Sequence, residues 1–550
     1  MQPVPDLSRF LLASIVLFSG DLPELLNEVI QHFNYDHRTL HSCILVNRLW
    51  CRLSIPLLWK NPFSIKFPKN YHYIEIYLYN LNGDDKTKLN EYAIYNKPFP
   101  TNTLFNYPSF IQYLDTNRII CSIDSWVETI KTSMTSAPIL SPSQKTNLTN
   151  LIYKSLFRIF IENNVNLQSI EFTLYNLEDL EWFDEILELM LQNPNFICNI
   201  KNLKLDFDIT DNMTKFSSFF HSNCNSISSL YLLFPSYHLD FLIIEKNLSQ
   251  IINSQKNLKR VLFGYSEFHS LYLPLSLKNS NCLNTLETII FYHVDFKNIT
   301  VLNEVFNQLN VLESIHLVYC YSIDSKFVQQ IINITKPFKL KSLFSDEICH
   351  VESLGLLIQK FGNCLENFGG GSRSQLLLQL IEPAIKYCNK IKLLYLVSGL
   401  NNQNINLTFS LIENIKQNLN YLFLQTLHFG LSSIILQNLG QVLPNKLEYL
   451  FLYLNININD FEIFLKNSQN TFIKKLIIRN RINGVSKDIF PYIEEYIMKK
   501  KKVKYLAILG IFDEDLFFLK DKVDEFKLHD IHVLRYYDSI LDIYDFIKND

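Results

Sequence analysis

The chain has 550 residues, and at this length a single compact core gives way to several domains or to an elongated array of repeats. Hydrophobic residues make up 48% of the chain and charged residues 19%, as in folded proteins, and the formal net charge is -3. So small a charge gives no field that would draw the whole protein to nucleic acid or anionic lipid. Because no stretch is as long as a membrane span either, we expect neither a nucleic-acid partner nor a membrane partner.

The N-terminal residues and the cysteines bear on the compartment. Phe10–Phe18 is an apolar run preceded by Arg9 and is similar to the core of a secretory signal peptide, but no convincing cleavage site precedes Gly20. The ten cysteines are scattered and no Cys-x-x-Cys occurs, so the sequence predicts neither a metal site nor a compact disulfide framework. Reduced thiols are typical of the cytoplasm and the nucleus, where we expect the protein. Secretion is the alternative.

The first predicted element is an amphipathic helix that starts at Asp21. Asp21 and Glu24 are placed as the cap and third residue of a capping box, and apolar residues recur at helical intervals: Leu22, Leu25, Leu26, Val29, Ile30 and Phe33. A second helical stretch starts at about Arg38, and a third apolar segment runs from Val46 to Trp59. So small a module, residues 21–62, is not securely stable alone and would gain from a partner helix.

Within this module the motif consists of Leu22-Pro23-Glu24-Leu25-Leu26, Val29-Ile30, Leu40, Leu45-Val46-Asn47-Arg48, Trp50 and Leu57-Leu58-Trp59. It resembles an F-box, with one residue fewer than usual between Pro23 and the Leu25-Leu26 pair. In that family three helices dock onto the Skp adaptor of SCF ubiquitin ligases. The resemblance therefore implies a Skp-type adaptor and the cullin complex as partners, and adaptor contacts by Leu22, Pro23, Ile30, Leu40, Leu45 and Val46. The alternative is a helical cap of the repeat array that follows.

Residues 63–150 form an intervening segment for which the sequence predicts irregular structure. Tyr71 to Tyr79 is a strand-like aromatic run, and Asn82-Gly83-Asp84-Asp85 is typical of a turn. Residues 131–147 are rich in Ser, Thr and Pro, which predicts a flexible connection.

From Leu167 to Val533 one signature recurs fourteen times: an aliphatic residue, two variable residues, an apolar residue, one variable residue and usually another apolar residue. The signatures are about 28 residues apart and begin at Leu167, Ile200, Ile227, Leu258, Leu286, Leu312, Leu340, Leu365, Ile391, Leu419, Leu447, Ile473, Val503 and Leu528. This is the core of a leucine-rich repeat. We therefore predict an α/β solenoid over residues 151–550, with parallel strands on a concave face and helices on the convex face. The alternative is a helical HEAT-type solenoid, whose repeat is longer and needs no apolar alternation.

Aromatic residues gather at the variable positions of three neighbouring repeats. Strand alternation points these positions out of the concave face, where ligands of such solenoids usually bind. They form one predicted patch for a target protein, followed on the next strand by two cations: Tyr395, Tyr421, Phe423, Tyr449, Phe451, Tyr453, Lys475 and Arg479. The alternative is an aromatic ladder that covers its own sheet or packs against another segment of the chain.

The sequence carries no motif for catalysis: it has no phosphate-binding glycine loop, no Gly-x-Ser-x-Gly elbow and no His-Glu-x-x-His. Gly369-Gly370-Gly371-Ser372 lacks the lysine of a P-loop and predicts a local irregularity or bulge. We expect no cofactor and no catalytic residue. The combined pattern predicts a substrate-recognition adaptor of an SCF-type ubiquitin ligase, in which the F-box-like helices bind the adaptor and the repeats bind the target. A leucine-rich-repeat scaffold unconnected to ubiquitin is the alternative.

Overall fold

The structure is a computed structural model of the chain. It describes residues 23–34, 36–65, 71–92, 103–133, 141–207, 213–234, 241–264, 276–278, 280–297, 299–345, 350–370, 377–397, 400–480, 489–510 and 514–549. The chain forms two compact units, Met1–Ser229 and Leu230–Asp550, referred to below as unit 1 and unit 2. The apolar run at Phe10–Phe18 and the predicted cap at Asp21 lie outside the described residues. No helix in the described ranges is long and apolar enough to cross a membrane.

Unit 1 begins with three helices, α2 (Pro23–Gln31), α3 (His37–Cys43) and α4 (Arg48–Trp59). Side chains cap the second and third helices: Asp36 accepts from the backbone N–H of Thr39, and Asn47 accepts from Leu49 and Trp50. The helices share a core made of Leu26, Ile30, Phe33, Leu40, Cys43, Trp50 and Leu57. The expected set of three helices is therefore confirmed.

Where the structure describes it, the intervening segment is mainly helical, contrary to the expectation of irregular structure. It contains α5 (His72–Leu78), α6 (Gly83–Glu91), α7 (Thr116–Ser133) and α8 (Pro142–Glu162). The prediction of a strand at Tyr71–Tyr79 was wrong, because Ile74, Tyr77 and Leu78 are buried at helical spacing. The predicted turn at Asn82 is the start of a helix, in which the Asn82 side chain accepts from the Asp85 N–H.

The stretch predicted as a flexible connection, residues 131–147, lies partly in α7 and partly in α8; its middle, residues 134–140, lies outside the described residues. Ser141 and Gln144 form a capping box around Pro142, the first residue of α8. Ser, Pro and Gln at this spacing therefore start a helix. α8 also runs across residue 150, where the sequence suggested the beginning of the repeats.

Unit 1 continues with a strand–helix alternation. Its strands are β1 (Tyr113–Asp115), β2 (Ser169–Leu174) and β3 (Asn202–Phe207), and its later helices are α9 (Leu177–Gln192) and α10 (Met213–Asn223). β1 was not predicted from the sequence. It pairs in parallel with β2, and β2 pairs in parallel with β3. Phenylalanines from β2, β3, α9 and α10 pack edge to face between the strands and helices: Phe172, Phe183, Phe207 and Phe216.

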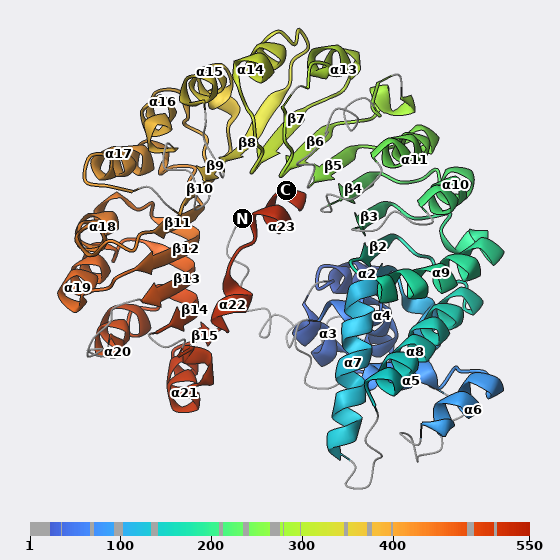
Figure 1. Ribbon diagram of the computed structural model, residues 1–550. Coiled ribbons are helices and arrows are strands. Elements are labelled where there is room, and N and C mark those ends of the chain that lie inside the picture. The colour runs from blue at the N-terminus through green and yellow to red at the C-terminus, as the bar shows by residue number, and fades with distance from the viewer. Residues whose placement is uncertain are drawn as a thin grey trace. The chain divides into compact units, whose positions relative to one another are not determined.

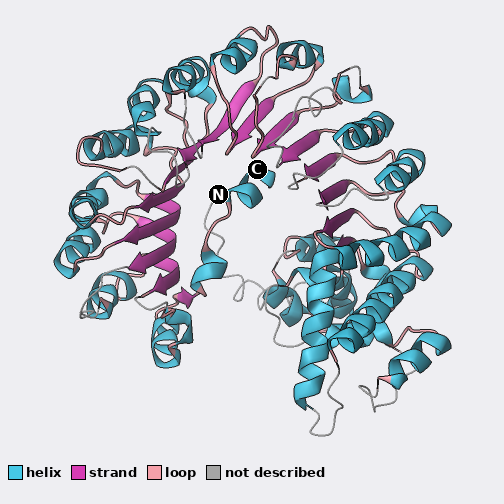
Figure 2. Ribbon diagram, in the orientation of Figure 1, coloured by secondary structure: helices cyan, strands magenta, loops and turns pink. Residues whose placement is uncertain are grey.

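Unit 2 repeats the alternation of strand and helix. After β4 (Ser229–Leu233), at the boundary between the units, its strands are β5 (Arg260–Gly264), β6 (Thr288–Tyr292), β7 (Ser314–Val318), β8 (Lys339–Ser345), β9 (Asn367–Gly370), β10 (Leu393–Leu396), β11 (Tyr421–Gln425), β12 (Lys446–Leu454), β13 (Phe472–Asn480), β14 (Val503–Leu509) and β15 (His532–Val533). Its helices are α11 (Phe241–Ser254), α13 (Leu302–Gln308), α14 (Ser325–Ile332), α15 (Val351–Phe361), α16 (Ile381–Tyr387), α17 (Ile405–Ile415), α18 (Phe429–Val442), α19 (Ile458–Asn467), α20 (Phe490–Ile493), α21 (Lys520–Leu528), α22 (Tyr536–Ser539) and α23 (Ile543–Lys548). Figure 2 shows the alternation.

The strands follow one another in the sheet in chain order, β1 to β15, and neighbouring strands such as β10 and β11, β11 and β12, and β12 and β13 pair in parallel. Each signature found in the sequence contains or leads into one strand, so the predicted strands are confirmed, and the helical HEAT-type alternative is wrong. We call the three apolar positions of a signature its slots. Residues in the third slot, such as Leu396, Leu424 and Leu452, are fully buried. The last signature is the weakest, since Leu528 is 84% exposed and β15 has two residues.

Gly369 and Gly370 lie in β9 and pair in regular register with β8 and β10, so the predicted irregularity does not occur at these two residues; Gly371 and Ser372 lie outside the described residues. The register shifts instead between Ile315 and His316 on β7. Within unit 2, helices such as α14 to α19 lie on one side of the strands, and α22 and α23 lie on the other (Figure 1). We call the sheet face of unit 2 that is opposite the helices α11 to α20 the inner face.

Candidate binding surfaces

The N-terminal helices carry apolar side chains on their surface as well as in their core. Leu25 and Val29, one helical turn apart on α2, are each 45% exposed. Leu45 and Val46, between α3 and α4, are 76% and 37% exposed. So many exposed apolar residues on so small a module are typical of an interaction surface.

The residues expected to contact an adaptor divide between surface and core. Pro23, Leu45 and Val46 are exposed, as that role requires. Ile30 and Leu40 are fully buried in the core of the module, so the expectation that these two face an adaptor is corrected. Leu22 lies outside the described residues. The exposed pair on α2, Leu25 and Val29, was not among the residues named from the sequence.

On the inner face, the aromatic residues line up across neighbouring strands as predicted. Tyr395 pairs with Phe423, which pairs with Phe451, and Tyr421 pairs with Tyr449. The rings of Phe423 and Tyr449 stack with centroids 4.8 Å apart, and those of Phe423 and Phe451 with centroids 5.5 Å apart. Alternate residues of the same strands, such as Leu422 and Leu424, are buried on the helix side.

The aromatic patch is not open, because the last residues of the chain pack against it. Tyr536 is 1% exposed and belongs to one apolar cluster with four of the predicted residues, Phe423, Tyr449, Phe451 and Tyr453. These four are at most 9% exposed, while Tyr395 and Tyr421 are half-buried. The expectation of an exposed target-binding patch is therefore corrected: the structure matches the alternative in which another segment of the chain covers the rings.

Lys475 and Arg479 lie over aromatic rings of the same patch. The Lys475 Nζ is 5.4 Å from the ring centre of Tyr449, and the Arg479 guanidinium is 4.7 Å from that of Tyr453. Each is a cation–π contact. Both side chains come from β13, the strand next to the tyrosines, as expected.

A hydrogen-bonded group of three buried polar residues lies on the inner face, with one residue on each of β7, β8 and β9. The Asn367 Nδ2 donates to the Ser342 Oγ at 2.9 Å, and the His316 Nδ1 lies 2.8 Å from the same hydroxyl. Burial, together with the positive charges of Lys341 and Arg260, lowers the pKa of His316 to about 3. The imidazole is therefore neutral at pH 7, and its tautomer decides whether Nδ1 donates to or accepts from the Ser342 hydroxyl.

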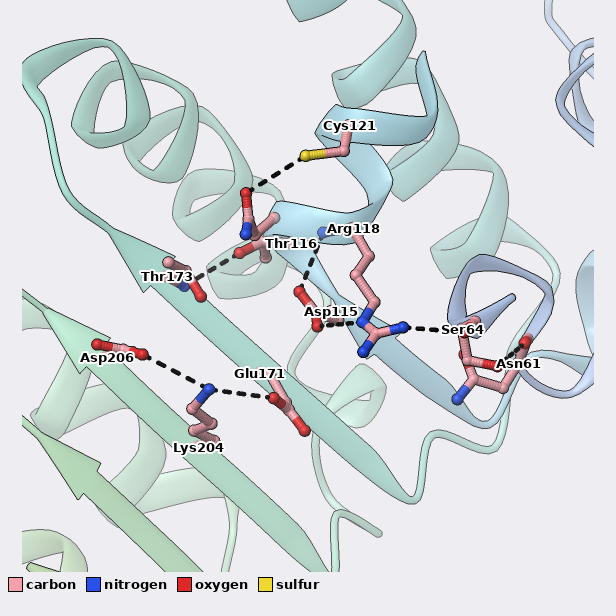
Figure 3. A network of polar contacts seen from close by, with 11 residues as sticks. Asn61, Ser64, Asp115, Thr116, Arg118, Cys121, Glu171, Thr173, Lys204 and Asp206 are labelled. Carbon is pink, nitrogen blue, oxygen red and sulfur yellow. Dashed lines mark hydrogen bonds and ion pairs between the residues drawn. The ribbon is translucent and has the colours of Figure 1, made fainter. Parts of the chain in front are cut away.

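In unit 1, β1, β2 and β3 carry a network of charged side chains (Figure 3). The Lys204 Nζ lies 3.5 Å from carboxylate oxygens of both Glu171 and Asp206, and the Arg118 Nε lies 3.2 Å from Asp115. Burial raises the pKa of Asp115 and of Asp206. Burial opposes the charge of Lys204 too, but the neighbouring carboxylates raise its pKa overall. The Lys204–Glu171 pair links β3 to β2, and the Arg118–Asp115 pair links the start of α7 to β1.

Comparison with known proteins adds no relative: no protein-family model matches the chain, and no curated protein is significantly similar to it. Within the residues that the structure describes, no group of three or more His, Cys, Asp or Glu side chains is arranged to hold a metal ion. The two candidate surfaces described above are the exposed apolar residues Leu25, Val29, Leu45 and Val46 and the covered inner face of unit 2.

Proposed function

We propose that the protein is a substrate-recognition adaptor of an SCF-type ubiquitin ligase, acting in the cytoplasm or nucleus. The helices α2 to α4 would bind a Skp-type adaptor within a cullin complex, and the leucine-rich-repeat solenoid would bind the target protein. In this proposal the chain supplies binding surfaces and no catalytic group.

One observation carries the adaptor half of the proposal: a small three-helix module with its own core leaves Leu25, Val29, Leu45 and Val46 on its surface. Exposed aliphatic side chains cost free energy in water and are stabilised when a partner covers them. A helix of a partner laid against such residues is a common mode of recognition. The F-box resemblance places Leu45 and Val46 at the adaptor contact, and both residues are exposed.

The test is co-purification of the full chain with a recombinant Skp-type adaptor. We expect Leu45→Asp/Val46→Asp to weaken adaptor binding at least about tenfold, a change of about 1.4 kcal/mol, because two charges would have to be buried at the contact. Leu104→Asp is the matched control, since Leu104 is 93% exposed in unit 1 but lies outside the three helices. Circular dichroism would verify that both variants fold.

An unchanged affinity of the folded double variant, or no adaptor binding by the unmodified chain, would contradict the ubiquitin link. The burial of Ile30 and Leu40 favours the alternative, a protein-binding scaffold unconnected to ubiquitin, because it removes two of the contacts that the F-box resemblance implies. A cullin that co-purifies with the chain and its adaptor would exclude that alternative.

A further inference from the structure

The segment Tyr536–Lys548, which contains α22 and α23, lies across the inner face of unit 2 (Figure 1). Its first residue, Tyr536, packs in the cluster of Phe423, Tyr449 and Phe451. Ile543 and Ile547, at 4% and 1% exposed, pack with inner-face residues from β4 to β10: Tyr231, Leu233, Leu262, Ile290, Val318, Phe344 and Leu393. One short segment thus covers apolar residues of strands that are far apart in the sequence.

Polar side chains of the inner face bind the main chain of this segment. The Tyr449 hydroxyl donates to the Ser539 carbonyl at 3.1 Å and accepts from the Leu541 N–H at 3.2 Å. An Arg260 guanidinium nitrogen donates to the Lys548 carbonyl at 2.7 Å. Hydrogen bonds to a backbone do not depend on the side chains of the bound segment, so a different peptide could form them equally well.

The segment differs from the repeats that it covers. α22 has four residues and α23 has six, lengths at which helices are not stable alone, and both follow the last strand of the sheet, β15. Its buried residues alternate with exposed apolar ones, Tyr537 at 53% and Ile540 at 41%. The inner face therefore holds the segment in place as it would hold a bound peptide.

We propose that the inner face of unit 2 is a groove for a short amphipathic helical peptide, and that Tyr536–Lys548 occupies this groove as an internal ligand that a target must displace. The proposal rests on the target-binding half of the proposed function. The target peptide would present aliphatic residues four apart, as Ile543 and Ile547 do, with two aromatic residues between them, in the positions of Tyr544 and Phe546. A basic residue would follow, because the Lys548 Nζ lies 4.8 Å from the centre of the Tyr231 ring.

The first test adds a fluorescently labelled peptide of residues 535–549 to the full chain and measures its anisotropy. We expect Ile543→Asp/Ile547→Asp in the full chain to release the segment and to bind the wild-type peptide at least about tenfold more tightly than the unmodified chain does. Ile540→Asp is the matched control, since Ile540 is exposed in the same segment, and it should bind the peptide no better than the unmodified chain. A folded double variant that binds the peptide no better than the unmodified chain overturns the proposal.

The second test uses the unmodified chain and so does not depend on how a variant folds. Hydrogen exchange should show the amides of α23 exchanging through a local opening, faster than those of β12 and β13. Exchange of α23 as slow as that of β12 would mean that the segment is a permanent part of the core, and the proposal would be wrong. Neither test involves the adaptor, so loss of adaptor binding with intact peptide binding would overturn the ubiquitin link and leave the groove.

Discussion

Gly369 on β9 lies where the inner face has no room for a side chain. A Cβ atom added there would lie 2.3 Å from the Tyr395 carbonyl oxygen and 2.6 Å from the Tyr395 Cβ on the neighbouring strand β10. Ordinary contact begins at 3.4 Å, so Gly369→Ala requires a shift of about 1 Å between two paired strands. Backbone atoms cannot rotate out of the way, so we expect this overpacking to lower the free energy of unfolding by about 1 to 3 kcal/mol.

The assay is urea unfolding of the full chain followed by circular dichroism, with Gly355→Ala as the control. Gly355 lies within α15, and a Cβ atom added there meets nothing within 4 Å. Alanine should therefore stabilise that helix by about 0.5 to 1 kcal/mol. Unfolding of Gly369→Ala at the same urea concentration as the unmodified chain would refute the argument from strand spacing.

Two further predictions concern buried residues of unit 2. Leu424→Ala should lower the free energy of unfolding by about 2 to 5 kcal/mol through cavity formation, whereas Leu427→Ala, at a leucine that is 50% exposed, should change it little in the same urea titration. Burial lowers the pKa of His316 to about 3, so this residue should make the folded chain less stable as the pH decreases. Below pH 6.5 the unfolded chain binds a proton at this residue, whereas the folded chain excludes the proton until about pH 3. Unfolding at pH 7 and pH 5 should show a loss from this residue of about 2 kcal/mol that disappears in His316→Asn; an equal pH dependence of variant and unmodified chain would contradict it.

The repeats were predictable because the spacing of apolar residues follows directly from strand geometry. In each repeat the second and third slots, such as Leu422 and Leu424, point to the same side of the sheet, where the helices bury them. β1 was not predicted because its signature, Ile111, Leu114 and Thr116, falls outside the regular spacing of the repeats, since two helices, α7 and α8, separate it from β2. The short strand is nevertheless stable as a neighbour of β2.

Local sequence was less informative before the repeats. The residues of α5 are mostly aromatic or β-branched, so propensity favours a strand, and tertiary burial of Ile74, Tyr77 and Leu78 overrides it. On α2, four aliphatic residues cover two sides of the helix, so periodicity alone does not decide which pair faces inward. The structure buries Leu26 and Ile30 and exposes Leu25 and Val29.

Cover of the inner face by another segment was left open as an alternative, but the identity of that segment could not have been predicted, because Tyr536–Lys548 belongs to no repeat. An open aromatic face of this kind would be prone to association, and the segment keeps the rings out of water. Because the chain itself covers the inner face, a target can bind in the proposed groove only after it displaces this segment. If the segment were displaced in about 1% of molecules, the apparent affinity of the target would be about 100-fold weaker than its affinity for the open groove. A modification or partner that released the segment would therefore restore binding by the same factor, without any new contact to the target.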